Sequence, residues 1–185
     1  MPFKVSQAIE KYEKQYIQVE RPDWNEYFLG LCFFIARRSE DANTRHGCIL
    51  TDQNHHIIGT GYNSLPRGIT PGLLPNTRPL KYQYMIHAEE NALLNTTLDP
   101  WLLNEGGICY CTAKPCLRCL YRLWNKNIRT MYVADTGYHF QDYEKEQEDF
   151  DAFVEDTGIN ILAIKPNLEW LKEPMEYLQE TKLIG

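Results

Sequence analysis

The stretch GICYCTAKPCLRCLYRLWNKNIRTMYVAD, residues 107–135, decides the fold class of this 185-residue chain. Residues 107–112 predict a strand, residues 116–126 predict a helix, and residues 130–135 predict another strand. Strands that alternate with helices along a chain are typical of a sheet layered with helices. The stretch therefore predicts an α/β fold with helices on both faces of a sheet.

The sequence on either side continues this alternation. Asp23 and Glu26 form a helix N-cap signature, and the run from there to about Ser39 is apolar nearly all round, so we expect a buried helix. Residues 48–52 and 56–63 flank the segment DQNH and predict a hairpin of two strands. The remaining expected elements are helices at residues 87–95, 144–157 and 168–181, and a short buried strand at residues 160–165.

Length and composition predict one domain over residues 1–185, with a polar lead-in at residues 1–22 and an acidic helical region at residues 144–185. The chain is 43% hydrophobic, which is enough for a sizeable core and argues against disorder. It has no apolar run of the roughly 18 residues that span a membrane, and its first residues lack the apolar region of a signal peptide. We therefore expect a cytoplasmic protein, in the host cytoplasm if its source is viral, with no membrane partner.

Cysteine usage and charge narrow the function classes further. Six cysteines at uneven spacing, without a secretion signal, indicate reduced thiols or metal ligands rather than a disulfide framework. Residues 141–185 hold twelve acidic residues and four lysines, whereas residues 1–140 hold thirteen acidic and fifteen basic residues. An acidic region beside a nearly neutral body is a poor surface for a polyanion. We therefore expect no polynucleotide partner, whereas one small phosphorylated molecule needs only a few local cations.

Two motifs together carry the chemistry: His87-Ala88-Glu89, and Pro115-Cys116-Leu117-Arg118-Cys119 later in the chain. Two thiolates and one imidazole suit tetrahedral zinc, and three protein ligands leave a fourth position for water, as in catalytic sites. Cys116 and Cys119 lie one turn apart at the start of the expected helix, whose positive end favours thiolates. Glu89 points away from the direction of His87, so we expect it beside the water, as the group that moves protons.

A structural zinc site is the alternative interpretation of the same cysteines. It needs a fourth ligand, which Cys109 or Cys111 could supply, because residues two apart on a strand point to the same face. A bare Cys-x-x-Cys motif leaves the His-x-Glu motif and the leading proline without explanation. We therefore favour the catalytic interpretation, since His-x-Glu followed by Pro-Cys-x-x-Cys is the zinc deaminase signature.

On these residues the chain resembles the cytidine-deaminase-like superfamily, and most closely its deoxycytidylate (dCMP) deaminase branch. The resemblance runs from about residue 23 to residue 164. Beyond the zinc motifs it rests on ARRSEDAN at residues 36–43, GYNSLPRG at residues 61–68, Lys81-Tyr82, and Asp135 followed by Tyr138. It implies a three-layer α/β/α sandwich with a five-stranded mixed sheet. It also implies zinc-dependent hydrolysis of dCMP to dUMP and ammonia, with Glu89 moving protons to N3 and the leaving amine.

The resemblance also assigns residues to the substrate. Asn63 matches the family asparagine that contacts the nucleotide. Arg38, Ser39 and Asn43 are candidates around the 5′-phosphate, and Tyr138 is a candidate for packing on the pyrimidine. For Arg38, a position at a solvated helix end is an equally good interpretation as substrate binding. For Tyr138, simple packing in the core is nearly as good an interpretation.

Family members are typically homohexamers that are activated by dCTP and inhibited by dTTP, with Mg²⁺ accompanying the triphosphate, and they supply dUMP for thymidylate synthesis. The proline- and glycine-rich loop at residues 63–81, with Arg67, Arg78 and Lys81, matches the regulatory region under this analogy. An ordinary surface loop with solvated cations is the alternative.

The sequence departs from the family pattern at two positions near these motifs. His46 stands where the family usually has a small apolar residue, and we assign it no role because a lone histidine is usually a core residue. Ser64 replaces the usual glycine after Asn63. The other functions that remain open are a nucleoside cytidine deaminase, a tRNA adenosine deaminase and a non-catalytic nucleotide-binding relative. Leu117 in place of glycine argues against a nucleoside cytidine deaminase. The acidic C-terminal region argues against a tRNA adenosine deaminase, and the presence of Glu89 argues against a non-catalytic relative.

Overall fold

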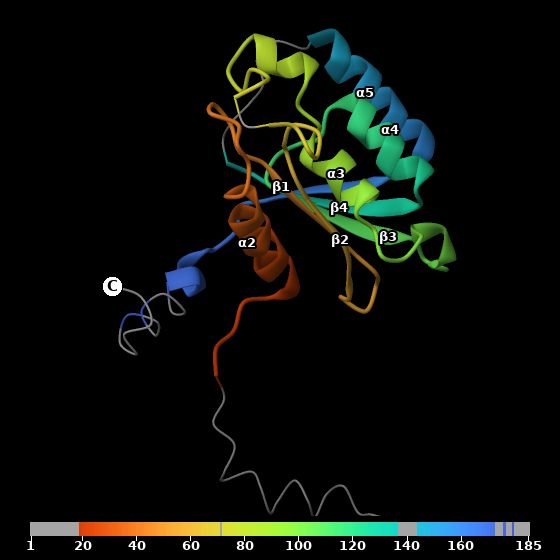
Figure 1. Ribbon diagram of the computed structural model, residues 1–185. Helices are drawn as coiled ribbons and strands as arrows, with labels where there is room; N and C mark the ends of the chain where they lie inside the picture. Colours follow the sequence, from red (N-terminus) through yellow and green to blue (C-terminus); the bar gives the residue numbers. More distant parts are fainter. Residues whose placement is uncertain (1–18, 71, 137–143, 173–175, 177–178, 180–185) are drawn as a thin grey trace, which may run out of the picture.

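The fold is seen in a computed structural model of the chain, which describes residues 19–70, 72–136, 144–172, 176 and 179 (Figure 1). A five-stranded sheet with the strand order β2-β1-β3-β4-β5 forms its centre. The strands are β1 (Gly47–Thr51), β2 (Ile57–Tyr62), β3 (Gly107–Cys111), β4 (Ile128–Ala134) and β5 (Asn160–Ile164). The helices are α2 (Trp24–Ala36), α3 (Ala88–Leu94), α4 (Leu117–Asn125) and α5 (Glu144–Thr157), with short 3₁₀ helices at Leu80–Gln83, Pro100–Leu102 and Glu169–Leu171.

The sheet is mixed, as predicted. Strand β1 pairs antiparallel with both β2 and β3, whereas β3, β4 and β5 run parallel to one another. Every residue of β1 and β3 is buried, because both strands have neighbours on each side and helices over both faces. The predicted hairpin is β1 followed by β2, with Cys48 opposite Gly61.

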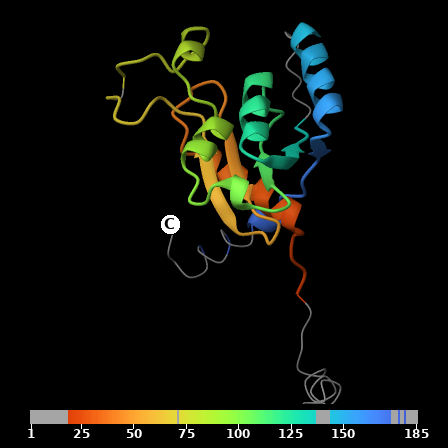
Figure 2. The same ribbon diagram turned by 90° about the vertical axis from the view of Figure 1, so that its right-hand side faces the viewer.

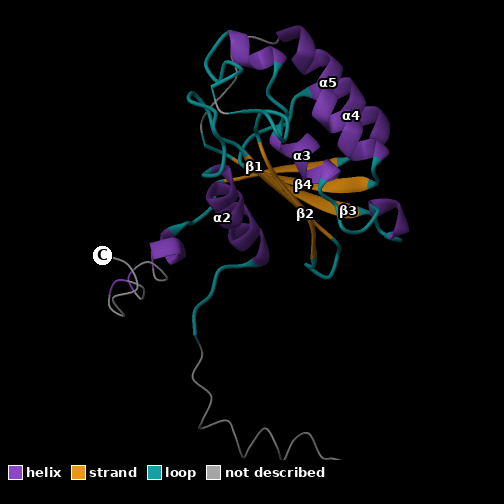
Figure 3. Ribbon diagram, in the orientation of Figure 1, coloured by secondary structure: helices purple, strands orange, loops and turns teal. Residues whose placement is uncertain are grey.

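Helices cover both faces of the sheet, which confirms the predicted three-layer α/β/α sandwich. Figures 1 and 3 show α2 on one face and α3, α4 and α5 on the other. Two hydrophobic clusters fill the spaces between these layers. The cluster under α2 contains Phe28, Leu29, Cys32, Ile49, Ile108, Tyr110 and Ala134. The larger cluster lies under α3, α4 and α5 and includes Leu50, Ala92, Leu120, Leu123, Met131 and Phe150. None of the helices among the described residues is long and apolar enough to cross a membrane.

Two expectations about burial need correction. Helix α2 is not buried all round, because Trp24 and Phe34 are 53% and 49% exposed. Strand β5 is not a buried strand, since it lies at the edge of the sheet and its residues are half-buried or exposed. In the turn between β1 and β2, the half-buried ring of His55 stacks on that of Trp24, with 4.4 Å between the ring centroids.

The ends of the chain lie largely outside the described residues. This holds for residues 1–18 of the predicted lead-in and for half of the predicted helix at 168–181, whose described part includes the 3₁₀ turn at Glu169–Leu171. Figure 2 shows the long loop after β2 (yellow) on the side of the molecule away from α5.

Candidate active site

The three predicted metal ligands come from the first residues of two helices. His87 is the N-cap of α3 and Cys116 is the N-cap of α4, while Cys119 lies in the first turn of α4. Each N-cap residue has an extended backbone and so stands just outside its helix. Because both helices pack on the same face of the sheet and contact each other, their N-terminal ends bring the three side chains together.

A glycine on β2 lets α3 reach this position. A methyl group on Gly61 would lie 2.2 Å from the carbonyl oxygen of Ala88 and 2.3 Å from the nitrogen of Ala92. The backbone of α3 therefore lies directly on the strand, with no side chain between them. Asn91 fixes the contact, because its Nδ2 donates a hydrogen bond to the carbonyl oxygen of Tyr62 at 2.8 Å. The position of His87 next to the two cysteines depends on this close approach.

The spacing of the three donor atoms fits one zinc ion. Nδ1 of His87 lies 3.5 Å from Sγ of Cys116 and 3.4 Å from Sγ of Cys119, and all three atoms lie within 4.8 Å of one another. In tetrahedral zinc sites, Zn–S bonds of about 2.3 Å and Zn–N bonds of about 2.0–2.1 Å place the sulfur and nitrogen about 3.5 Å apart. The described residues thus present donors of the right type at the right separation.

Hydrogen bonds within this group decide which sulfur is ionised. The hydrogen bond with Cys119 lowers the pKa of Cys116 to about 4, against the opposing effect of burial, and His87 stabilises the thiolate further. The same hydrogen bond raises the pKa of Cys119, which therefore keeps its proton. Contact with the Cys116 sulfur raises the pKa of His87 above its ordinary value. A thiolate beside an imidazole is the electrostatic arrangement of a metal-binding or nucleophilic cysteine.

Glu89 lies beside the metal group and not in it. Its side chain is buried, and burial raises the pKa of its carboxyl group, which the nearby His87 only partly offsets. The group of potential metal ligands found among the described residues contains His87, Cys116 and Cys119 without Glu89. A buried carboxylate with a raised pKa, next to a metal site, suits a group that accepts and returns protons near neutral pH.

The fourth cysteine ligand of the structural alternative is not brought into this group. Cys109 lies in the core with its Sγ 3.5 Å from that of Cys48, and Cys111 contributes to the same buried cluster. Within the described part of the chain the metal group therefore keeps three members. This arrangement favours the open, catalytic interpretation over a closed structural site.

Asn63, the predicted substrate ligand, is the centre of a buried polar network. Its Nδ2 donates to Oδ2 of Asp41 and to the carbonyl oxygen of Thr44, both at 2.9 Å, and its Oδ1 accepts from the backbone nitrogen of His46 at 2.7 Å. Both amide hydrogens are thus used within the protein. One lone pair on Oδ1 remains available for a ligand.

The acidic partner in this network is Asp41, which is 2% exposed and paired with the ammonium of Lys81. Burial raises the pKa of the Asp41 carboxyl group, but hydrogen bonds from Lys81 and from the backbone nitrogens of Thr44 and Asn43 outweigh it, and the pKa is lowered. The pair joins the segment before β1 to the end of the long loop. The sequence motif contains Asp41 without indicating this role, which depends on Lys81 forty residues later.

The other predicted substrate residues lie around the same segment. Ser39 is buried, and its Oγ accepts from the backbone nitrogen of Asp41 at 3.1 Å. Asn43 is exposed, and its Oδ1 accepts from the backbone nitrogen of Arg78 at 2.7 Å. Arg38 is exposed just after the end of α2. Tyr138 lies outside the described residues.

The three predicted effector residues differ in exposure. Arg67 and Arg78 are exposed, with Arg67 donating to the side chain of Asn95. Lys81 is 3% exposed because its ammonium is paired with Asp41. Its charge is therefore paired inside the protein, and its part in the regulatory region stays a prediction.

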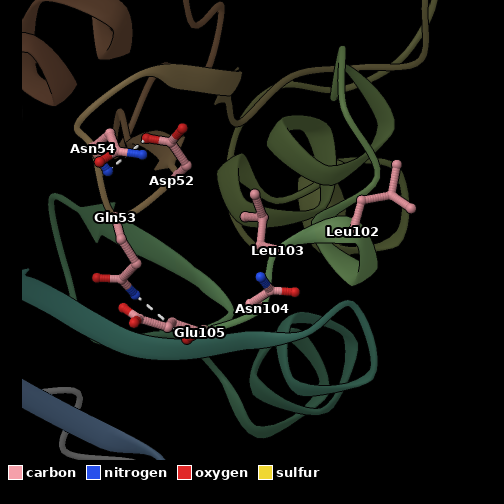
Figure 4. Close-up of a pocket in the computed structure, with 7 residues that line it drawn as sticks. All are labelled: Asp52, Gln53, Asn54, Leu102, Leu103, Asn104 and Glu105. Atoms are coloured by element: carbon pink, nitrogen blue, oxygen red, sulfur yellow. Dashed lines mark hydrogen bonds between the residues drawn. The ribbon is translucent and has the colours of Figure 1, made fainter.

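A pocket of about 350 Å³ lies elsewhere, at the far end of β1 from the metal group (Figure 4). It is lined by Asp52, Gln53, Asn54, Leu102, Leu103, Asn104 and Glu105. The carboxylate of Asp52 is already used by His56 and by the backbone nitrogens of its own turn. The pocket therefore lies between the β1–β2 turn and the segment before β3, and it shares no residue with the metal group.

Several known proteins are similar to this chain. The deoxycytidylate deaminase of Homo sapiens is 31% identical over 126 residues, which cover 65% of this chain and 69% of the human protein. That of Saccharomyces cerevisiae is 31% identical over 157 residues, 80% of this chain and 47% of the yeast protein. The solved structure of dCMP deaminase from the cyanophage S-TIM5 in complex with dCMP and dUMP has a TM-score of 0.58 and 19% identity. It covers 79% of this chain and 100% of that one, which shows a shared fold.

The matching family model covers the part of the chain that holds strands β1 to β4, the metal group and Glu89. It is described as the cytidine and deoxycytidylate deaminase zinc-binding region, and it matches residues 22–135. Together with the human relative, this match shows that the chain is a member of the cytidine and deoxycytidylate deaminase family.

Proposed function

We propose that this protein is a zinc-dependent dCMP deaminase, which converts dCMP and water to dUMP and ammonia. The observation that carries the proposal is the three-donor group of His87, Cys116 and Cys119 beside the buried carboxylate of Glu89. The proposal is supported by membership of the family and by relatives that are named deoxycytidylate deaminases. The source protein of one similar solved structure binds dCMP and dUMP.

His87, Cys116 and Cys119 would hold the zinc ion, since their donor atoms have the spacing of a tetrahedral site. When bound, zinc supplies the Lewis acid that activates water for hydrolysis at neutral pH. Glu89 takes one proton from the water and delivers it to N3 of the cytosine ring. It then takes the second proton, from the hydroxyl added at C4, and gives it to the departing amine. The oxygen of water replaces the amino group at C4, so dUMP and ammonia account for all atoms.

The nucleotide would lie between the metal group and the segment before β1. Asn63 has one free lone pair for the sugar or base, while Ser39, Asn43 and Arg38 lie on the side where we place the 5′-phosphate. Tyr138 remains our candidate for packing on the ring. The Asp41–Lys81 pair holds the walls of this region together.

We extend the proposal to regulation and assembly by analogy with the family. Activation by dCTP with Mg²⁺, inhibition by dTTP, and a homohexamer are proposed, with Arg67 and Arg78 as the exposed cations of the effector region. Lys81 would act there by anchoring the loop to Asp41. We also propose a single catalytic domain in the cytoplasm that supplies dUMP for thymidylate synthesis.

One assay tests the substrate. Purified, zinc-loaded protein is incubated separately with dCMP, cytidine, dCTP and an adenosine-containing tRNA stem-loop, and ammonia release is followed. We expect dCMP to be the preferred substrate, and preference for any of the others would overturn the proposal. Titration of dTTP against the rate tests regulation separately, because a response that stays flat removes the effector proposal alone.

A further inference from the structure

His46, which has no role in the sequence motifs, is hydrogen-bonded to Asn63 of the candidate site. It directly precedes β1, and its backbone exchanges hydrogen bonds with Asn63: the His46 nitrogen donates to Oδ1 and the Asn63 nitrogen donates to the His46 carbonyl oxygen. Gly47, the next residue, pairs with Tyr62 on one side and contacts Thr112 on the other. Because Thr112 directly follows β3 and precedes the Pro-Cys motif, His46 stands at the end of the sheet that carries the metal group.

Thr112 fixes the tautomer of the His46 ring. Its hydroxyl oxygen lies 3.2 Å from Nδ1 of His46 and accepts a hydrogen bond from the backbone nitrogen of Gly47, also at 3.2 Å. Thr112 is buried, so its own hydroxyl hydrogen needs an acceptor, and Nδ1 is the one at hand. Donation to Nδ1 places the ring hydrogen of His46 on Nε2.

The hydrogen on Nε2 is available to a ligand. The imidazole is half-buried, and among the described residues Nε2 has no hydrogen-bond partner, nor is it a buried atom left without one. Burial and the nearby His87 lower the pKa of His46, with smaller effects from Asp41, Lys81 and Arg78. Through Asn63, which accepts from the His46 nitrogen and donates to Asp41, His46 adjoins the Asp41–Lys81 pair, on the side where we place the nucleotide.

We propose that His46 is a substrate-contacting residue whose Nε2–H donates a hydrogen bond to an acceptor oxygen of the bound nucleotide, and that Thr112 positions it. This inference rests on the proposed function, because it needs a nucleotide in the site. An apolar residue at this position has no donor to offer. The acceptor is an oxygen of the phosphate, the sugar or the base.

The test compares three variants by steady-state kinetics with dCMP and deoxycytidine, together with zinc content and thermal stability. His46→Leu removes the donor and should lower kcat/KM for dCMP about five- to tenfold, mainly through KM, since one neutral hydrogen bond is lost. His46→Gln restores an N–H at a similar reach and should recover most of this loss. Thr112→Val, which frees the ring, should give a smaller loss in the same parameter.

Controls separate a substrate contact from a structural role. Thr112→Ser keeps the hydroxyl and should resemble the wild type. His56→Leu removes an exposed histidine on the β1–β2 turn and should leave both substrates unaffected. A loss that is larger for dCMP than for deoxycytidine identifies a phosphate oxygen, whereas an equal loss on both identifies the sugar or base.

Two results would overturn the inference. One is unchanged kinetics for His46→Leu, and the other is equal losses for His46→Leu and His46→Gln at unchanged zinc content and stability. In either case, turnover of dCMP by the wild type would still uphold the proposed function. If His46→Leu does not fold, His46→Gln and Thr112→Val still decide, because near-wild-type kinetics in Thr112→Val contradict the positioning role. If the wild type turns over another nucleotide, the same variants are compared on that nucleotide.

Discussion

Five of the six cysteines fall into two groups that lie close together and differ in chemistry, while Cys32 lies apart in the core under α2. Cys116 and Cys119 stand at the N-terminal end of α4 beside His87, where hydrogen bonds lower the pKa of Cys116 to about 4. Cys48, Cys109 and Cys111 lie on β1 and β3 in the core, where burial raises the pKa of Cys48, and Cys111 rises to about 11.

The comparison shows that position in the fold decides whether a thiol binds metal. Strands β1 and β3 place their cysteines between two layers, where the surroundings are apolar and an ionised sulfur is unfavourable. The start of α4 offers Cys116 a partly open position, a helix N-terminus and two hydrogen-bond partners. Four predictions test this contrast.

The largest effect is expected at the metal group itself. Cys116→Ser should remove zinc and with it all measurable turnover, because a hydroxyl does not replace a thiolate ligand. Elemental analysis and ammonia release check this together. Full zinc occupancy in the variant would break the contrast, since the sulfur would then not be a ligand.

Glu89→Gln should keep zinc and lower turnover by about 10²–10⁴-fold, because the amide has the shape of the carboxylate but cannot move protons. Elemental analysis checks the metal, and initial rates check the loss. Loss of zinc in this variant would contradict the position of Glu89 beside the metal group.

In metal-free protein, the rate at which a thiol reagent labels Cys116 should be level between about pH 5.5 and 8. Its pKa near 4 means that the thiolate is present throughout this range and is lost only as the pH falls through 4. An ordinary thiol, with a pKa of about 8.5, instead gains about tenfold per pH unit below that value. Mass spectrometry locates the label, and added zinc should suppress it. Cys48 and Cys109 should stay unlabelled until the protein unfolds, and labelling of these residues in the native state would break the comparison.

The smallest effect is expected in the core. Cys109→Ala should lower the free energy of unfolding by about 1 kcal/mol, because a small cavity replaces the buried sulfur. Zinc content and turnover should remain those of the wild type, as measured by denaturant titration, elemental analysis and rates. Reduced zinc content in this variant would show that the core cysteines affect the metal group, and this would contradict the contrast between the two groups.

The sequence contained most of the fold, because the alternation of elements around residues 107–135 has one common layered solution. What it misjudged was the burial of β5 and of α2. Both have apolar compositions typical of interior elements, yet β5 is an edge strand and, among the described residues, α2 shares its face only with the short 3₁₀ turn that carries Trp170. An apolar sequence pattern indicates that a segment prefers to be buried. It does not indicate which other helices or strands are present to cover that segment.

The metal group could be predicted because its members belong to two short sequence motifs, each of which stands at the start of a helix. The partner of Asp41 could not, since Lys81 comes from the end of a long loop whose path the sequence does not determine. His46 was set aside for a related reason. Its significance comes from Thr112, sixty-six residues away, which no local pattern connects to it.

Gly61 has a consequence that reaches well beyond its strand. Since the atoms facing it belong to main chain, an added methyl cannot be accommodated by a rotamer change, and the whole first turn of α3 would have to lift. That displacement would carry the imidazole of His87 away from the two sulfurs. A saturation screen scored by metal uptake should therefore find this glycine as intolerant as the ligands themselves, although it has no atom that could coordinate anything.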